Sequence, residues 1–196
     1  MQSGSELGEV DQAEVVKTFT RLTDTFASCH KEGLARIENL QGDLKFFLRL
    51  GKDGFVRWVY LEESSLGDYE TEKCILDAIR GTRWPRPDEG EAEVRSGASF
   101  DAPNVRMPIA WGADRLSAVI AKQAKVVEKC KKNGKIGVFH VTAYVKARGK
   151  RGRVQAVGVA APRRDAEAAS ECIVRAVRSW EVPSPGARGA KVSFDL

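Results

Sequence analysis

The feature that most constrains how this chain folds is a stretch of sequence that occurs twice. Residues 74–80 read Cys-Ile-Leu-Asp-Ala-Ile-Arg, followed by a Trp-Pro segment and by the triplet Ser-Phe-Asp at 99–101. Residues 172–178 read Cys-Ile-Val-Arg-Ala-Val-Arg, followed by a tryptophan, two prolines and Ser-Phe-Asp at 193–195. Such internal repetition indicates that one structural unit occurs twice in tandem. The other features of the chain are therefore interpreted copy by copy.

Each copy begins with a segment that has the pattern of an amphipathic helix. In the first copy, apolar residues recur at gaps of three and four, which places them along one helical face. They are Val15, Phe19, Leu22, Phe26 and Cys29, and a shift of 101 residues maps them onto Leu116, Ile120, Gln123, Val127 and Cys130. Gly33 and Gly134 follow these two stripes, so we expect them to end the helices.

Strand-like runs and a second helix complete each copy. In the first, the runs 43–50 and 55–61 flank Asp-Gly, a strong signal for a β-hairpin. The corresponding runs of the second copy are 138–145 and 154–159. A helix with the repeated cysteine segment comes next, and each copy closes on a last strand, at 91–101 and at 190–196. The offset in residue number between corresponding positions of the two copies changes only where loops are expected, as insertions in a folded repeat require.

This pattern predicts an α+β fold of two tandem α-β-β-α-β repeats. In each repeat, a three-stranded antiparallel sheet packs against two helices, which cover its apolar face. We expect the first repeat at residues 13–101 and the second at 113–196. Residues 1–12 precede both repeats and are predicted to be disordered or tag-like.

Residues 102–112 are predicted to be the linker between the repeats. Prolines at two positions favour an extended chain. Four residues of the linker are too apolar for a free tether, so we expect it to lie against one of the domains. They are Val105, Met107, Ile109 and Trp111.

The formal net charge of +5 hides an asymmetry between the two halves of the chain. Residues 1–100 carry 19 acidic and 13 basic side chains, a net charge of −6, whereas residues 101–196 carry 8 and 19, a net charge of +11. Such a division favours an anionic partner for the second half or docking of the halves on one another. Unrelated drift of two solvated surfaces is the alternative.

The four cysteines occupy parallel positions in the two copies, one near the end of each first helix and one in each second helix. The repeat favours the pairs Cys29–Cys74 and Cys130–Cys172 among the three possible connectivities. Closing loops of that length contributes roughly 3–4 kcal/mol in the loop-entropy model. Four buried free thiols are the alternative. The sequence has no Cys-x-x-Cys pair, so we predict no metal site.

The order of these motifs resembles a known family. The Asp-Gly hairpin, the segment Glu-Glu-Ser-Ser-Leu-Gly-Asp at 62–68, the cysteine segment and Trp-Pro-x-Pro at 84–87 resemble TonB-type C-terminal domains. They look closest to the C-terminal domain of gliding-motility envelope proteins of the AgmX/PglI type. Residues 113–196 are similar to the same family, with Ala-Ala-Pro-Arg-Arg-Asp at 160–165 in place of the Ser-Ser-Leu-Gly segment. The resemblance implies a periplasmic module that binds a partner peptide or protein, often through an exposed edge of its sheet.

Disulfides also predict an oxidising compartment, and hence the periplasm or cell envelope. The first residues of the chain have neither a basic segment nor an apolar one, so no signal peptide is visible. We therefore expect Met1 to open a processed or cloned fragment of an envelope protein, from which a membrane tether has been removed.

No residue pattern predicts catalysis or a cofactor. The sequence contains no phosphate-binding loop, dinucleotide fingerprint or metal motif. Cys29 and His30 are neighbours on a helix and point about 100° apart, so they cannot pair directly. We expect His30 at the surface, His140 facing solvent or an interface, and Glu62-Glu63 solvated at a strand end. The chain is therefore predicted not to be an enzyme and to need no cofactor.

Two surfaces are candidates for binding. The tip of the second hairpin concentrates cations beside glycines, a pattern suited to phosphate or another anionic group. These cations are Lys146, Arg148, Lys150, Arg151 and Arg153. The last strand offers an edge that an extended peptide can complete. The residues of that edge are Val192, Ser193 and Phe194. Solvation of the hairpin, and pairing of this strand within the protein, are the respective alternatives.

These observations predict a non-enzymatic periplasmic or cell-envelope module for protein–protein interaction. We expect it to belong to an envelope-spanning or gliding-motility assembly and to bind another envelope protein or an extended peptide. The alternative is binding of a polyanion, an envelope polymer or a nucleic acid, through the basic second repeat.

Overall fold

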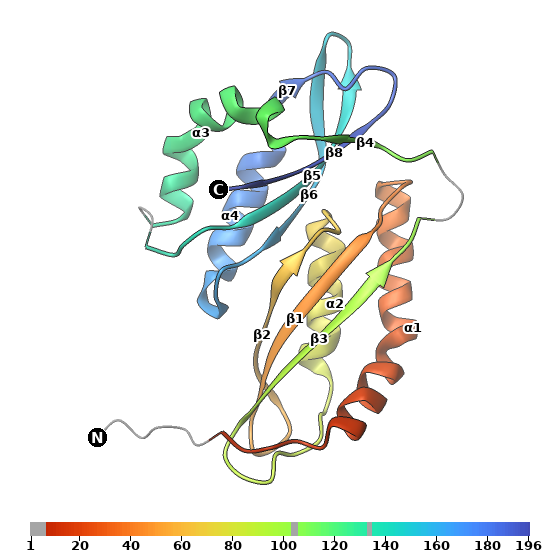
Figure 1. Ribbon diagram of the computed structural model, residues 1–196, viewed down its shortest axis with the longest axis vertical. Helices are drawn as coiled ribbons and strands as arrows, with labels where there is room; N and C mark the ends of the chain where they lie inside the picture. Colours follow the sequence, from red (N-terminus) through yellow and green to blue (C-terminus); the bar gives the residue numbers. More distant parts are fainter. Residues whose placement is uncertain (1–6, 103–105, 133–134) are drawn as a thin grey trace.

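A computed structural model describes residues 7–102, 106–132 and 135–196 of the chain. Within these ranges the fold is α+β, with four α-helices and two sheets (Figure 1). The helices are α1 (Gln12–Arg36), α2 (Tyr69–Gly81), α3 (Ser117–Cys130) and α4 (Glu167–Arg178), and 3-10 turns η1 (Ala113–Leu116) and η2 (Arg164–Ala166) precede the last two. The strands are β1 (Gly42–Leu50), β2 (Val56–Ser64), β3 (Ala92–Phe100), β4 (Ile109–Trp111), β5 (His140–Arg148), β6 (Arg151–Ala160), β7 (Glu181–Pro183) and β8 (Ala190–Asp195).

The N-terminal half contains an antiparallel sheet with the strand order β2-β1-β3. Alternate residues of β1 are apolar, and Leu44, Phe46 and Leu48 are buried in one cluster with residues of α1 and α2. The period of two places these side chains on a single face of the sheet. Helices α1 and α2 cover that face because their apolar stripes need the same burial.

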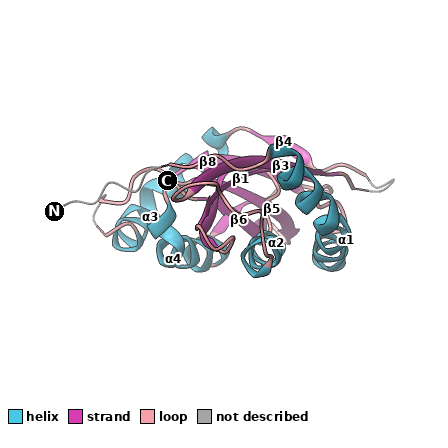
Figure 2. Ribbon diagram, turned by 90° about the horizontal axis from the view of Figure 1, so that it is seen from below, coloured by secondary structure: helices cyan, strands magenta, loops and turns pink. Residues whose placement is uncertain are grey.

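The C-terminal half contains a five-stranded sheet with the order β4-β8-β5-β6-β7. Its central strands β8-β5-β6 are antiparallel and pack on α3 and α4 through a second apolar cluster. In Figure 2, α2, α3 and α4 lie on one side of the strands. The C-terminal sheet therefore has more strands than the three that were predicted, because two short strands extend it at its edges.

Those two short strands come from connecting segments. Ile109–Trp111, in the predicted linker, forms β4 and pairs in parallel with Ala190–Val192 of β8. β7 follows α4 and pairs with Arg151–Arg153 of β6. The expectation that the linker lies against a domain is confirmed for β4, whereas Val105 lies outside the described residues.

The end of α1 corrects one prediction. Gly33 does not end this helix, which continues to Arg36. Gly33 is buried against α2, and a Cβ there would lie 2.3 Å from Oγ1 of Thr71. Close helix packing, rather than termination, is the physical reason for this glycine. Helix α3 ends at Cys130, and Gly134 lies outside the described residues.

The predicted disulfides are both present. Cys29–Cys74 joins α1 to α2, and Cys130–Cys172 joins α3 to α4, with Cα–Cα distances of 5.9 and 5.5 Å. Disulfides are typical of proteins in oxidising compartments. Among the described residues, no helix is both long enough and apolar enough to cross a bilayer.

Candidate functional site

In the described part of the chain, the outer edge of β3 is an unpaired edge of the N-terminal sheet. β3 pairs with β1 along one side, from Ala92 to Phe100. In the described part of the chain no strand pairs with the other side, and the nearest contact is the bridge between Leu7 and Glu91. Alternate N–H and C=O groups of such an edge are available to another chain.

Strand β3 and helix α1 lie side by side (Figure 1), and a groove lies between them. It encloses about 1290 Å³, part of it open to solvent. Its lining is largely apolar and includes Val16, Phe19, Phe26, Ala98 and Phe100. Val16 is 62% exposed, so apolar surface is accessible at one wall of the groove.

His30 lines the groove, and the prediction that it lies at the surface is wrong. Its side chain is buried, with Nε2 2.8 Å from the carbonyl oxygen of Leu40 and its ring 5.0 Å from that of Phe100. The apolar stripe of α1 turns this position toward the loop before β1, and the hydrogen bond satisfies the buried ring nitrogen. This arrangement is that of a structural histidine.

The edge predicted for the last strand is not free. Strand β4 occupies the outer side of β8 as far as Val192, so the prediction of an open edge is wrong for that part. Val192 and Phe194 are buried in the second apolar cluster, and the hydroxyl of Ser193 lies 2.8 Å from that of Thr142. The linker supplies the missing strand, which sequence periodicity over three residues does not reveal.

The basic hairpin lies where it was predicted, between β5 and β6. Lys146 is opposite Arg153 and Arg148 is opposite Arg151, so four cations share one face of the ribbon. Lys150 occupies the turn, and all five side chains are exposed. Arg151 forms an ion pair with Glu181 of β7.

Charged groups of opposite sign meet where the two halves contact each other. Arg178 Nη1 of α4 donates a hydrogen bond of 2.6 Å to Glu70 Oε1 at the start of α2. Nη2 of Arg80 lies 3.8 Å from Oε1 of Glu167. The first pair joins a cation of the basic half to a carboxylate of the acidic half, whereas the second pair has the opposite sense, so these contacts join the halves without accounting for the charge asymmetry.

Glu72 is the central side chain of this contact, and no sequence motif identified it. Its carboxylate is buried and accepts hydrogen bonds from Ser64 Oγ, from Gly67 N and, at 3.0 Å, from Val159 N on β6. Burial raises the pKa of this carboxyl group. A Cβ at position 158 would lie 2.1 Å from Glu72 Oε1, so Gly158 is needed for this approach.

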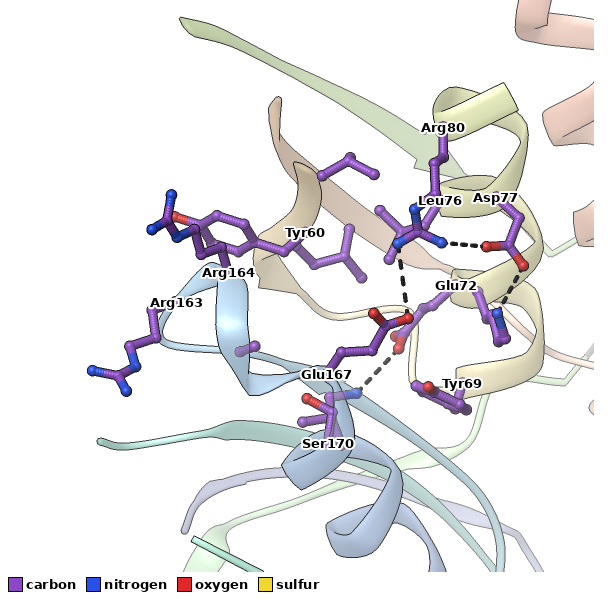
Figure 3. Close-up of a pocket in the computed structure, with 15 residues that line it drawn as sticks. Tyr60, Tyr69, Glu72, Leu76, Asp77, Arg80, Arg163, Arg164, Glu167 and Ser170 are labelled. Carbon is purple, nitrogen blue, oxygen red and sulfur yellow. Dashed lines mark hydrogen bonds and ion pairs between the residues drawn. The ribbon is translucent and has the colours of Figure 1, made fainter. Parts of the chain in front are cut away.

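Figure 3 shows the side chain of Glu72 extending from α2 toward the start of α4. Above it, a cavity of about 530 Å³ that is partly open to solvent is lined by Tyr60, Leu76, Arg80 and Arg164, among others. The guanidinium of Arg164 stacks on Trp58 of β2 at 4.2 Å from the ring centroid. Both the lining of this cavity and the stacking of Arg164 on Trp58 involve residues of the N-terminal and of the C-terminal half.

The remaining candidates for chemistry have ordinary surface partners. His140 is exposed, as predicted, and its Nδ1 lies 2.5 Å from Oδ1 of Asp195. Glu62 accepts a hydrogen bond from Arg95, and Glu63 pairs with Lys45 at the protein surface. Among the described residues no cysteine is free and no cluster of potential metal ligands occurs.

Comparison with protein-family models, with curated proteins and with solved structures finds no match for this chain. Function is therefore inferred from the geometry of the chain itself. That geometry offers an unpaired strand edge beside an apolar groove, and a separate projecting cluster of cations.

Proposed function

We propose that this chain is a non-enzymatic module that binds an extended segment of a partner protein by adding it to β3. The observation that carries the proposal is the unpaired edge of β3 beside the apolar groove of α1. The main-chain groups supply affinity, and the groove supplies specificity for alternate side chains. The partner is another protein of the cell envelope or a peptide segment of one.

The two faces beside the edge of β3 suit an extended peptide. Side chains of an added strand alternate between the two faces of the sheet. On one face they meet Phe19, Phe26 and Phe100, and on the other they meet the charged row that includes Glu93 and Arg95. A peptide with alternating apolar and polar residues fits both environments.

The two halves have the characteristics of tandem TonB-like units, and we propose that assignment for the chain. In each half the first two strands form a hairpin, and the last long strand pairs on the other side of the first. A disulfide links the two principal helices of each half. The proposal extends to a periplasmic setting and to an envelope-spanning or gliding-motility assembly, for which the disulfides are the physical support.

Peptide selection followed by hydrogen exchange tests this proposal. A library of displayed random peptides is selected on the full chain, and the selected peptides are synthesised. We expect sequences with alternating apolar residues, and we expect alternate amides of β3 to become protected when they bind. Because strand addition relies on main-chain hydrogen bonds and apolar contacts, affinity changes little with salt.

A pair of matched substitutions supplies the control. Ala27→Trp fills the groove from an exposed position of α1, and Ala124→Trp adds the same ring to an exposed position of α3. The first is expected to abolish binding and the second to preserve it. Protection that maps outside β3, or equal binding by both variants, would refute the assignment, as would a selection that yields no binding peptide.

A further inference from the structure

The basic hairpin presents its cations as an organised patch. Neighbouring same-face residues along a strand are about 7 Å apart, and directly opposite residues are about 5 Å apart. The paired positions Lys146/Arg153 and Arg148/Arg151 therefore define a compact rectangle of four positive side chains. Within the described chain, Lys146, Arg148 and Arg153 form no ion pair with a carboxylate.

The patch continues onto the neighbouring loop. The segment between β7 and β8 adds the exposed Arg188, and the chain has no acidic residue from Lys146 to Arg153 or from Pro183 to Ala190. Glu181 is the one carboxylate that pairs with the patch in the described structure. The hairpin and this loop lie together at one end of the longest axis of the molecule (Figure 1).

The charge distribution over the whole chain also favours contact between this patch and an anionic surface. The two halves are stacked along the longest axis, and they carry net charges of −6 and +11. An extended negative surface attracts the C-terminal end and repels the N-terminal half. The long-range field therefore orients the molecule with the hairpin toward that surface.

We propose that the end formed by the β5–β6 hairpin and the 184–189 loop docks on the surface of an anionic lipid bilayer. The cations stand on a projecting ribbon, which suits a planar array of headgroups. From Val145 to Val154 the ribbon has no aromatic residue on which nucleic-acid bases stack. This function is independent of peptide binding at β3, which lies in the other half.

Co-sedimentation with lipid vesicles tests the proposal on the full chain. We expect binding to vesicles of phosphatidylcholine with phosphatidylglycerol, loss of binding as salt increases, and no binding to phosphatidylcholine alone. Each cation near an anionic surface strengthens binding about fivefold. The variant Arg148→Gln/Lys150→Gln is therefore expected to bind about 25-fold more weakly.

Lys125→Gln/Lys129→Gln on α3 is the matched control, because it removes two exposed charges away from the hairpin. This control is expected to bind within about twofold of the wild type, and unchanged thermal unfolding shows that both variants are folded. Equal weakening in the two variants, or absence of binding to the anionic vesicles, overturns the proposal. Binding of soluble polyphosphate without vesicle binding overturns it in favour of a linear polyanion.

Discussion

Replacement of Gly158 by alanine tests whether Glu72 holds the two halves together. In the structure, an added Cβ would lie 2.1 Å from Glu72 Oε1 and 2.7 Å from the Cα of Gly67. Overpacking of this kind costs about 1–3 kcal/mol. Displacing Glu72 also leaves the buried N–H of Val159 without its acceptor, at a further cost of about 1–3 kcal/mol. We therefore expect the free energy of unfolding to fall by about 2–6 kcal/mol.

Urea unfolding followed by tryptophan fluorescence measures this loss. Because each half has its own apolar cluster and disulfide, we also expect the single transition to broaden or to divide into two. Gly81→Ala is the control, since a Cβ there meets no atom within 4 Å at the end of α2. Equal stability of Gly158→Ala and the wild type would show that the halves are not held together at Glu72.

Two further predictions concern the disulfides and a partly buried lysine. Replacing Cys130 and Cys172 by alanine opens a cross-link between residues 42 apart, which is expected to lower the free energy of unfolding by about 4 kcal/mol. A loss below about 1 kcal/mol in non-reducing urea titrations would contradict this account. Burial lowers the pKa of Lys191 to about 8, despite the nearby Asp43 and Glu72. The unfolded chain binds more protons in that range, so stability is expected to rise between about pH 8 and pH 10.5. In Lys191→Met this rise should disappear, and its persistence would assign it to another group.

The sequence alone predicted the order of the principal elements. Helix stripes and strand alternation are local properties, so Phe19, Leu22 and Phe26 on α1 and Leu44 and Phe46 on β1 fix element type without knowledge of the fold. The disulfide pairing also followed from the sequence. Comparison of the two copies restricted which cysteines could be close, and the structure confirms both pairs.

The prediction of an open edge at β8 is wrong as far as Val192, because edges are a tertiary property. Whether a strand is open depends on which other segment pairs with it, and a three-residue strand such as β4 carries too little periodicity to be recognised. Among the described residues, the structure covers the outer side of β8 from Ala190 to Val192 with that strand and leaves the outer side of β3 without a paired strand. The basic hairpin could be located from the sequence because its cations are adjacent along the chain.

The positions of His30, Glu72 and Gly158 were decided by the tertiary structure alone. Their partners lie 10 to 87 residues away in the chain, at Leu40 and Val159. A polar residue on a helix has the same sequence signature whether it is solvated or buried against a partner, and burial depends on packing between distant segments. Sequence therefore determined the elements and their cross-links, and packing of the two halves determined which edge, groove and carboxylate are available.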